Sequence, residues 1–311
     1  MDKVQQVSVR ELIEQKRTKK FKRIVEKGVP VIVFLAAVIS VLTTVGIIFT
    51  LLFETFEFFK RVSIVQFLGT TWLPFSNKEA LYGILPLVVG TLKVTFIAIV
   101  VAVPLGLASA IYLSEYASEK VRKSIKPVLE VLAGVPTIVY GFFALTFLTP
   151  LLQTIIPSLK IFNAISPGIV VGIMILPMIV SLSEDAMSAV PNSIREAALG
   201  LGATKFEVAL KVVLPAALSG IVASVVLATS RAIGETMIVS LAGGSTPRFD
   251  AVFTESIQTM TAYIVQVSSG DAGYGTTIYY SIYAVGFTLF IFTLLMNLFA
   301  QFISKRFREE Y

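Results

Sequence analysis

The stretch that decides the fold is a short polar segment between two long apolar windows. From residue 184 to residue 215 it reads EDAMSAVPNSIREAALGLGATKFEVALKVVLP. The flanking windows, 161–183 and about 212–243, are each longer than the roughly 20 residues that cross a bilayer as a helix. We therefore expect this segment to leave the membrane as a loop that joins two spans.

Helix-start signals divide this loop into two short helices. Ser193 precedes Glu196 by three residues, and Thr204 precedes Glu207 by three. This spacing is typical of a capping box, in which the two side chains bond to each other's backbone N–H groups. The sequence predicts helices that begin near Ser193 and near Thr204.

Helix-stop signals complete the prediction. Gly202 can adopt the left-handed conformation that ends the first helix. Pro215 should stop the second helix near Leu214, because the residue before a proline avoids the helical region. The result is a compact helical hairpin, shaped either to fit a groove on another protein or to stand as a plain connection.

Apolar windows dominate the rest of the chain. Of the 311 residues, 55% are apolar and only 15% are charged, against about 25% charged in ordinary soluble domains. Because lipid-exposed backbone must satisfy its hydrogen bonds internally, each window should be a helix. The predicted fold class is an all-α polytopic membrane protein with six transmembrane helices. The other four windows are 29–53, 83–113, 131–153 and 272–304.

Basic residues predict the orientation of the chain. Nineteen Lys and Arg fall in segments 1–28, 114–127, 184–211 and 304–311, and five fall in segments 54–82, 154–160 and 244–271. Since basic loops remain in the cytoplasm, both termini are expected there. The net charge of +6 is then a topology signal and gives no indication of nucleic-acid binding.

These signals predict a division of the chain into consecutive regions. They are a cytoplasmic basic amphipathic tail (1–28), a first transmembrane helix (29–53), an outer interfacial segment (54–82), a five-helix core with its cytoplasmic loop (83–304, loop 184–215) and a cytoplasmic tail (305–311). Ser8 and Glu11 form a capping box that predicts a basic helix on the membrane surface, with a solvated tail as the alternative. The aromatic residues of 54–82, Trp72 among them, lie at the interface or pack on neighbouring helices.

The hairpin carries a motif that resembles a known signature. Glu196, Ala197, Ala198, Gly202, Leu214 and Pro215 match the E-A-A-x3-G-x9-I-x-L-P pattern of bacterial ABC importer permeases, with Val212 in place of isoleucine. The resemblance implies a type I (MetI-like) importer permease architecture. It also implies that these six residues couple the chain to a cytoplasmic ATPase subunit.

Two charged residues interrupt the fifth window. Arg231 and Glu235 are four residues apart, so one helix would place them on the same face as a pair. A charge at mid-bilayer costs at least about 2.5–3.5 kcal/mol and normally faces a bundle interior or a watery path. Arg231 can offer its fork of donors to a tetrahedral oxyanion while Glu235 orients it. The alternative is an ion pair that only locks helices together.

Lys93 is a third intramembrane charge, in the outer half of the second window, with no obvious partner in the sequence. It can draw an anion toward the pathway, or it can extend to the outer interface, which we favour.

Further stretches resemble the phosphate-specific branch of these permeases. Residues 230–237, SRAIGETM, are similar to a motif whose arginine and glutamate are implicated in phosphate transport, and Met237 favours the C-type subunit over its A-type partner. Stretches 63–68, 90–92, 102–106, 110–116 and 134–141 agree with that subunit.

The resemblance implies a permease subunit that forms half of the pathway of an ATP-driven inorganic phosphate importer in a prokaryotic inner membrane. It implies as partners an A-type permease, a cytoplasmic ATP-binding subunit dimer and an extracytoplasmic phosphate-binding protein. The alternatives are a permease for sulfate or molybdate, or a scaffold that transports nothing.

An enzyme is the class that the sequence disfavours. The chain has no His and no Cys, which removes the commonest metal ligands and general base, and it has no P-loop. Glu184, Asp185 and Glu196 lie in the predicted hairpin loop, and the spans contain no Asp for a paired-carboxylate protease. We expect no catalytic residue, no metal and no cofactor on this chain, with ATP and Mg bound by the partner ATPase.

Overall fold

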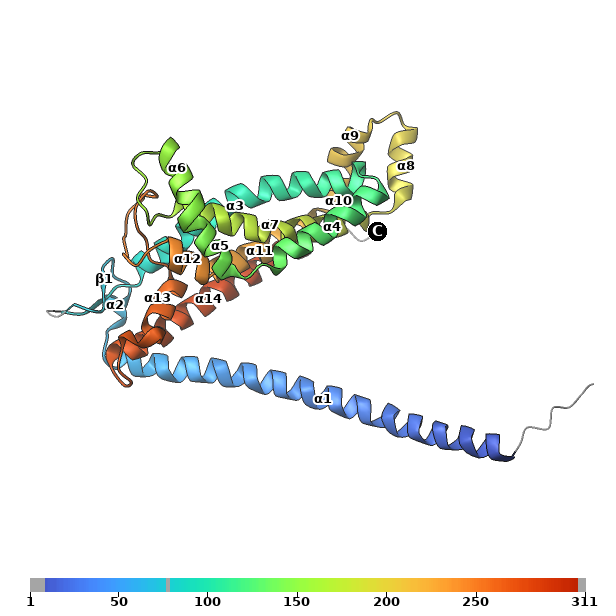
Figure 1. Ribbon diagram of the computed structural model, residues 1–311, viewed down its shortest axis with the longest axis horizontal. Helices are drawn as coiled ribbons and strands as arrows, with labels where there is room; N and C mark the ends of the chain where they lie inside the picture. The colour runs from blue at the N-terminus through green and yellow to red at the C-terminus, as the bar shows by residue number, and fades with distance from the viewer. Residues whose placement is uncertain (1–8, 77–78, 307–311) are drawn as a thin grey trace, which may run out of the picture. The chain divides into compact units, whose positions relative to one another are not determined.

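The computed structural model describes residues 9–76 and 79–306, which are almost entirely helical (Figure 1). Labels with η mark π-helical turns. In chain order the elements are α1 (Val9–Phe59), α2 (Ile64–Phe67), β1 (Trp72–Leu73), β2 (Leu81–Tyr82), α3 (Leu85–Ile111), η1 (Tyr112–Tyr116), α4 (Glu119–Gly134), α5 (Thr137–Phe143), η2 (Ala144–Leu148), α6 (Thr149–Ile155), α7 (Ile165–Ser188), α8 (Asn192–Gly200), α9 (Lys205–Val208), η3 (Ala209–Val213), α10 (Leu214–Ala216), α11 (Leu218–Ile233), α12 (Met237–Ala242), α13 (Met260–Gln266), η4 (Val267–Asp271) and α14 (Thr277–Arg306).

Five helical stretches in the described residues are long and apolar enough to cross a bilayer. They are Gly28–Phe59, Leu85–Tyr116, Thr137–Ile155, Ile165–Ser188 and Thr277–Phe299. A sixth candidate is a bent pair, Lys205–Ala216 with Leu218–Ile233, whose halves differ in direction by 71°. The predicted polytopic all-α class is confirmed, and the six windows correspond to these six stretches when the bent pair counts as one.

The helix boundaries differ most from the apolar windows in the first, third and fifth windows. The first helix extends past both ends of its window, from Val9 to Phe59. The third window loses its first residues to α4, because the chain is extended at Val135 and Pro136 before α5 begins. The fifth window is broken twice, at Ala217 and again at residues 234–236. Hydropathy reports which residues lie in lipid or core, and it does not register such breaks.

The chain forms two compact units, Met1–Phe53 and Glu54–Tyr311. In the first unit, residues 29–53 form a continuous helix whose apolar side chains are mostly exposed, as a lipid-facing span requires. The capping box predicted at Ser8 lies outside the described residues.

In the second unit, α3, α7 and α11 form the centre of the bundle (Figure 1). Small residues allow α3 and α7 to approach closely: a Cβ added at Gly106 would lie 2.8 Å from the Ile179 side chain, and one at Gly172 would lie 3.0 Å from the Ala98 carbonyl oxygen. Such close packing is typical of helix pairs in membranes. This centre supports the polar groups described below.

Segment 54–82 contributes to a second, aromatic core. Trp72 and Tyr82 pair across a two-residue antiparallel ladder, and the Trp72 ring meets the Tyr263 ring edge-on at 4.8 Å. Phe58 is also fully buried there, whereas Phe56 is exposed. The aromatic residues of this segment therefore divide between packing and exposure.

Candidate functional site

The structure places Arg231 and Glu235 on opposite sides of a helix break. α11 ends at Ile233, and α12 begins at Met237. Among the described residues no ion pair joins the two side chains. The predicted pairing on one helical face is wrong, because that geometry needs an uninterrupted turn between them.

Glu235 is held at the start of α12. Its Oε1 accepts hydrogen bonds from the backbone N–H groups of Met237 (3.0 Å) and Ile238 (3.2 Å). The Thr261 hydroxyl donates to the Glu235 carbonyl oxygen (2.7 Å), which ties the break to α13. The carboxylate is largely buried, so it satisfies N–H groups that a helix start leaves without partners.

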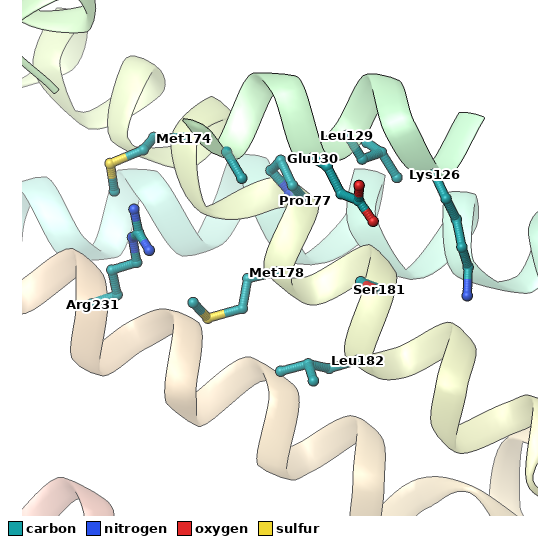
Figure 2. Close-up of a pocket in the computed structure, with 10 residues that line it drawn as sticks. Lys126, Leu129, Glu130, Met174, Pro177, Met178, Ser181, Leu182 and Arg231 are labelled. Carbon is teal, nitrogen blue, oxygen red and sulfur yellow. The ribbon is translucent and has the colours of Figure 1, made fainter. Parts of the chain in front are cut away.

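Arg231 is exposed and lines a cavity of about 370 Å³ between α4, α7 and α11 (Figure 2). Its guanidinium points toward Met174 of α7, while Lys126 and Glu130 reach in from α4. Within the described part of the chain, no hydrogen bond or ion pair engages the guanidinium. The cavity therefore presents a cation whose donors are available to an anion.

Polar contacts between helices fix the direction of α11. The hydroxyls of Ser183 and Ser224 lie 2.7 Å apart and join α7 to α11 in a fully buried contact. The Ser230 hydroxyl donates to Asn297 Oδ1 of α14 at 2.9 Å. Because Arg231 follows Ser230 directly, these contacts limit where its side chain can point.

Lys93 is a buried lysine whose ammonium reaches the loop that follows α12. Its side chain is 6% exposed, and its ammonium contacts Asp250 Oδ1 and the Val252 carbonyl oxygen, both at 2.8 Å. The hydrogen bond from Lys93 lowers the pKa of Asp250. Both partners lie in the loop after α12, which gives Lys93 a structural contact that its local sequence does not reveal.

The polar hairpin is present, with one of its two predicted caps. Thr204 and Glu207 form the expected capping box at α9, and Gly202 has the expected left-handed φ of +92°. The prediction of a capping box at Ser193 is wrong. α8 begins at Asn192 with Pro191 as its N-cap, so Ser193 already lies inside the first helical turn.

The second helix of the hairpin does not stop before Pro215. The π-helical turns of η3 lead directly into α10, whose first turn contains Pro215 and which ends at Ala216. A proline is tolerated in a first helical turn because its missing N–H has no partner to lose there.

The residues that resemble the importer signature lie mainly on the surface of the hairpin. Glu196, Ala197, Gly202 and Pro215 are exposed, while Ala198 and Leu214 are half-buried. The structure adds apolar side chains that sequence reasoning did not single out, Leu201 (90% exposed) and Phe206 (63% exposed). An exposed apolar cluster in a polar loop is typical of a surface that another protein covers.

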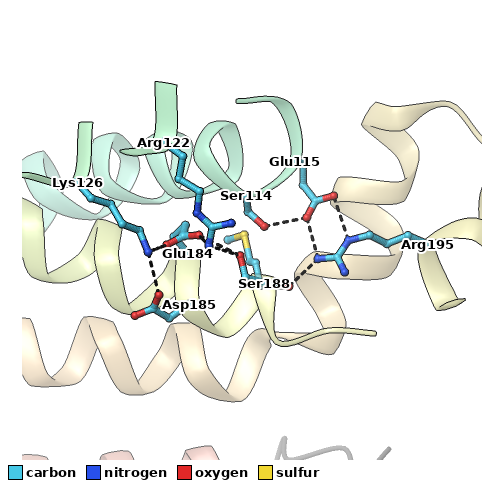
Figure 3. A network of polar contacts seen from close by, with 9 residues as sticks. Ser114, Glu115, Arg122, Lys126, Glu184, Asp185, Ser188 and Arg195 are labelled. Atoms are coloured by element: carbon cyan, nitrogen blue, oxygen red, sulfur yellow. Dashed lines mark hydrogen bonds and ion pairs between the residues drawn. The ribbon is translucent and has the colours of Figure 1, made fainter. Parts of the chain in front are cut away.

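An ion cluster joins α4 to the C-terminal turns of α7 (Figure 3). The fully buried Glu184 pairs with Arg122 and with Lys126 (2.6 Å) and accepts a hydrogen bond from Ser188 (2.9 Å). Lys126 also pairs with Asp185 at 3.2 Å. These contacts raise the pKa of Lys126, chiefly through the hydrogen bond to Glu184. Arg122 and Lys126 lie about 60 positions from Glu184 and Asp185, so the local sequence does not predict these pairs.

In the described residues, no three His, Cys, Asp or Glu side chains gather as a metal site.

Comparison with known proteins identifies several relatives. Residues 102–309 match the family model described as binding-protein-dependent transport system inner membrane component. The chain is 35% identical to the probable ABC transporter permease protein YqgH of Bacillus subtilis, over 79% of each chain. It is 32% identical to the phosphate transport system permease protein PstC of Mesorhizobium japonicum, over 87% of each chain.

Solved structures share the fold. A bacterial alginate ABC transporter chain superposes with a TM-score of 0.60 at 15% identity, covering 94% of this chain and 96% of its own length. A chain of the MetNI methionine ABC transporter, in an inward-facing conformation, superposes with a TM-score of 0.53 at 19% identity. The match covers 73% of this chain and 95% of the transporter chain.

Proposed function

The chain belongs to the family of inner membrane components of binding-protein-dependent transport systems, as a permease subunit of an ABC importer, and we propose that its cargo is inorganic phosphate. The position of Arg231 in the wall of the cavity is the observation on which this proposal rests. Its guanidinium faces a cavity between three helices with no carboxylate bound to it in the described residues. A planar fork of N–H donors fits two oxygens of a tetrahedral oxyanion.

Relatives support phosphate as that oxyanion. Several curated relatives at about 32% identity over most of the chain are named phosphate transport system permease protein PstC. We infer that Arg231 binds the anion during transit. Glu235 contributes by fixing the break after α11, and Lys93 by holding the outer loop.

The proposed assembly places this chain beside an A-type permease, with both termini in the cytoplasm. A cytoplasmic ATPase dimer, which binds ATP and Mg, docks on the hairpin through Glu196, Gly202 and the exposed Leu201 and Phe206. An extracytoplasmic phosphate-binding protein delivers cargo to the opposite face. Closure of the ATPases would move the hairpin and so alternate access to the cavity.

The test is phosphate uptake by membrane vesicles that contain the assembled transporter with Arg231→Gln. A charge-assisted hydrogen bond contributes about 1.5–3 kcal/mol, so we expect uptake to fall about tenfold or more. Lys123→Gln, on the exposed face of α4, is the control and should leave uptake unchanged. Normal uptake by Arg231→Gln, with the complex intact, would remove Arg231 from the pathway. Sulfate or molybdate uptake by the wild type, in place of phosphate, would reassign the cargo.

A further inference from the structure

Arg195, in the first turn of α8, has every one of its N–H donors engaged. Nε and Nη2 donate to the two carboxylate oxygens of Glu115, at 3.4 and 3.1 Å. Nη2 also donates to the Met187 carbonyl oxygen (2.7 Å). Nη1 donates to the Val190 carbonyl oxygen and to Asn192 Oδ1 (3.3 Å). A guanidinium has five N–H groups, and these five contacts use them all.

The contact is also sheltered from solvent. The side chains of Arg195 and Glu115 are 15% and 10% exposed, and the Ser114 hydroxyl donates to Glu115 Oε1 at 2.9 Å. Figure 3 shows the guanidinium fork facing the carboxylate. A partly buried, two-pronged pair of this kind is stronger and more directional than an exposed ion pair.

The apolar packing of α8 is shallow. None of its residues is buried, and Ala198 packs only partly buried against the neighbouring apolar cluster. The second half of the hairpin differs, because Val208 and Val213 are buried in an apolar cluster with Met187 and Ile221. Buried side chains therefore hold α9 and η3, whereas α8 is held by the partly buried Ala198 and by the hydrogen bonds of Arg195.

The elements joined by Arg195 connect the hairpin to the cavity. Glu115 belongs to η1, the π-helical end of α3, and π-helical turns are frequent at functional sites. Met187 lies in the last turn of α7, the helix that supplies Met174 and Met178 to the wall around Arg231. A displacement of α8 is thus passed directly to α3 and α7.

We propose that the Arg195–Glu115 clamp is the positioning element that couples the motion of the docking hairpin to the helices around the cavity. This inference rests on the proposed function, because it requires an ATPase to move the hairpin. Arg195 and Glu115 touch neither ATP nor the anion in this scheme. Their loss separates ATP hydrolysis from transport and leaves both partners bound.

The experiment measures phosphate transported per ATP hydrolysed by the complete complex reconstituted in vesicles. Arg195→Lys keeps the charge but supplies three donors without the fork, and Glu115→Gln keeps the shape but removes the negative charge. Each should lower the ratio at least about threefold, as for residues that act in one network. Because both substitutions break the same contact, the double variant should be no worse than the more severe single variant.

Two readouts distinguish this inference from its alternatives. Co-purification of the ATPase should be normal in all three variants, and Lys211→Gln, which removes an exposed ion pair on the same hairpin, should leave the ratio unchanged. A wild-type ratio in Arg195→Lys, or a parallel loss of ATPase binding and transport, would overturn the clamp. Failure of the proposed function would appear instead as unaltered uptake by Arg231→Gln.

Discussion

Arg231 and Glu235 are four positions apart in the sequence, yet their side chains make different contacts in the structure. The guanidinium lines the cavity, while the carboxylate accepts two backbone N–H groups at the start of α12. Separation matters for an anion site, because a carboxylate bound to the arginine would compete with the cargo for the same donors. The helix break removes that competition.

The role of Glu235 as an acceptor leads to a graded prediction. Glu235→Gln retains a carbonyl oxygen for the N–H groups of α12, whereas Glu235→Ala leaves two largely buried donors without a partner. We expect Ala to cost about 1–2 kcal/mol more than Gln, measured as the shift in unfolding temperature of the purified complex. A Gln variant that unfolds like the wild type yet transports no phosphate would show that the carboxylate contacts the anion instead.

The pair formed by Lys93 and Asp250 predicts a pH dependence of the outer loop. Contacts with Lys93, the Val252 N–H and Arg248 hold the pKa of Asp250 below its ordinary value. A lowered carboxyl pKa stabilises the folded state above the unfolded value of about 3.9, and this contribution disappears as pH falls through the folded pKa. Protection of the loop amides from hydrogen exchange, corrected for intrinsic rates, should be constant from pH 8 to about 5 and decline only below about pH 4.

Asp250→Asn supplies the comparison for that experiment. It should lower the protection of the loop around Val252 throughout the range and abolish the acid step. An acid step that survives in Asp250→Asn would assign the titration to a different carboxyl group. Asp185→Asn, at the ion cluster between α4 and α7, should leave the loop unchanged.

Among the elements, the hairpin has one buried part and one exposed part. Val208 and Val213 pack in an apolar cluster, whereas Leu201 and Phe206, which we call the tip of the hairpin, are exposed to solvent. If the tip docks on the ATPase, Leu201→Asp and Phe206→Asp should each reduce ATPase co-purification at least about tenfold, the usual result of placing a charge at an apolar contact. Full ATPase recovery with both variants would place the docking surface elsewhere. Val128→Asp, on the exposed face of α4, is a matched control.

The capping box of α9 provides a test of the hairpin's own stability. The Thr204 hydroxyl accepts the Glu207 N–H at 3.3 Å, and the Glu207 carboxylate accepts the Thr204 N–H at 3.1 Å. Thr204→Ala should destabilise this turn by about 1 kcal/mol, whereas Thr204→Ser should cost far less because the hydroxyl remains. Limited proteolysis at the hairpin reports the difference. Ser193→Ala is the control and should have no such effect, because Ser193 makes no cap.

Across the whole molecule, local and long-range features differ in how far the sequence predicts them. The presence of the apolar spans, the Thr204 cap and the left-handed Gly202 depend on neighbours a few residues away, and these three predictions are confirmed, although the bounds of the spans are not. Lys93 and Asp250 are 157 positions apart in the sequence, and Arg195 and Glu115 are 80 positions apart. No local sequence pattern therefore predicts either ion pair.

The prediction of one helix over the fifth window, 212–243, was wrong for a related reason. An apolar run predicts burial in lipid or core but not an unbroken helix, and the break before α12 is stabilised by Thr261 from α13, 26 positions away. Likewise, Ser193 and Glu196 have the spacing of a capping box, but α8 begins after Pro191, two residues earlier than a cap at Ser193 requires. When two helix-start signals lie within a few residues of each other, the backbone conformation decides which one acts, and the residue pattern alone does not give that conformation.

The distribution of basic residues makes a final prediction about the orientation of the whole chain. Nineteen Lys and Arg on one side against five on the other places the ends, α4 and the hairpin in the cytoplasm. The chain has no cysteine, so single introduced cysteines report their side without background. In intact cells, a membrane-impermeant maleimide should label Thr70→Cys and Ser269→Cys but not Lys120→Cys or Ser124→Cys, all at exposed positions. Permeabilised cells should label all four. The reverse pattern in intact cells would invert the protein and place the hairpin out of reach of any cytoplasmic ATPase.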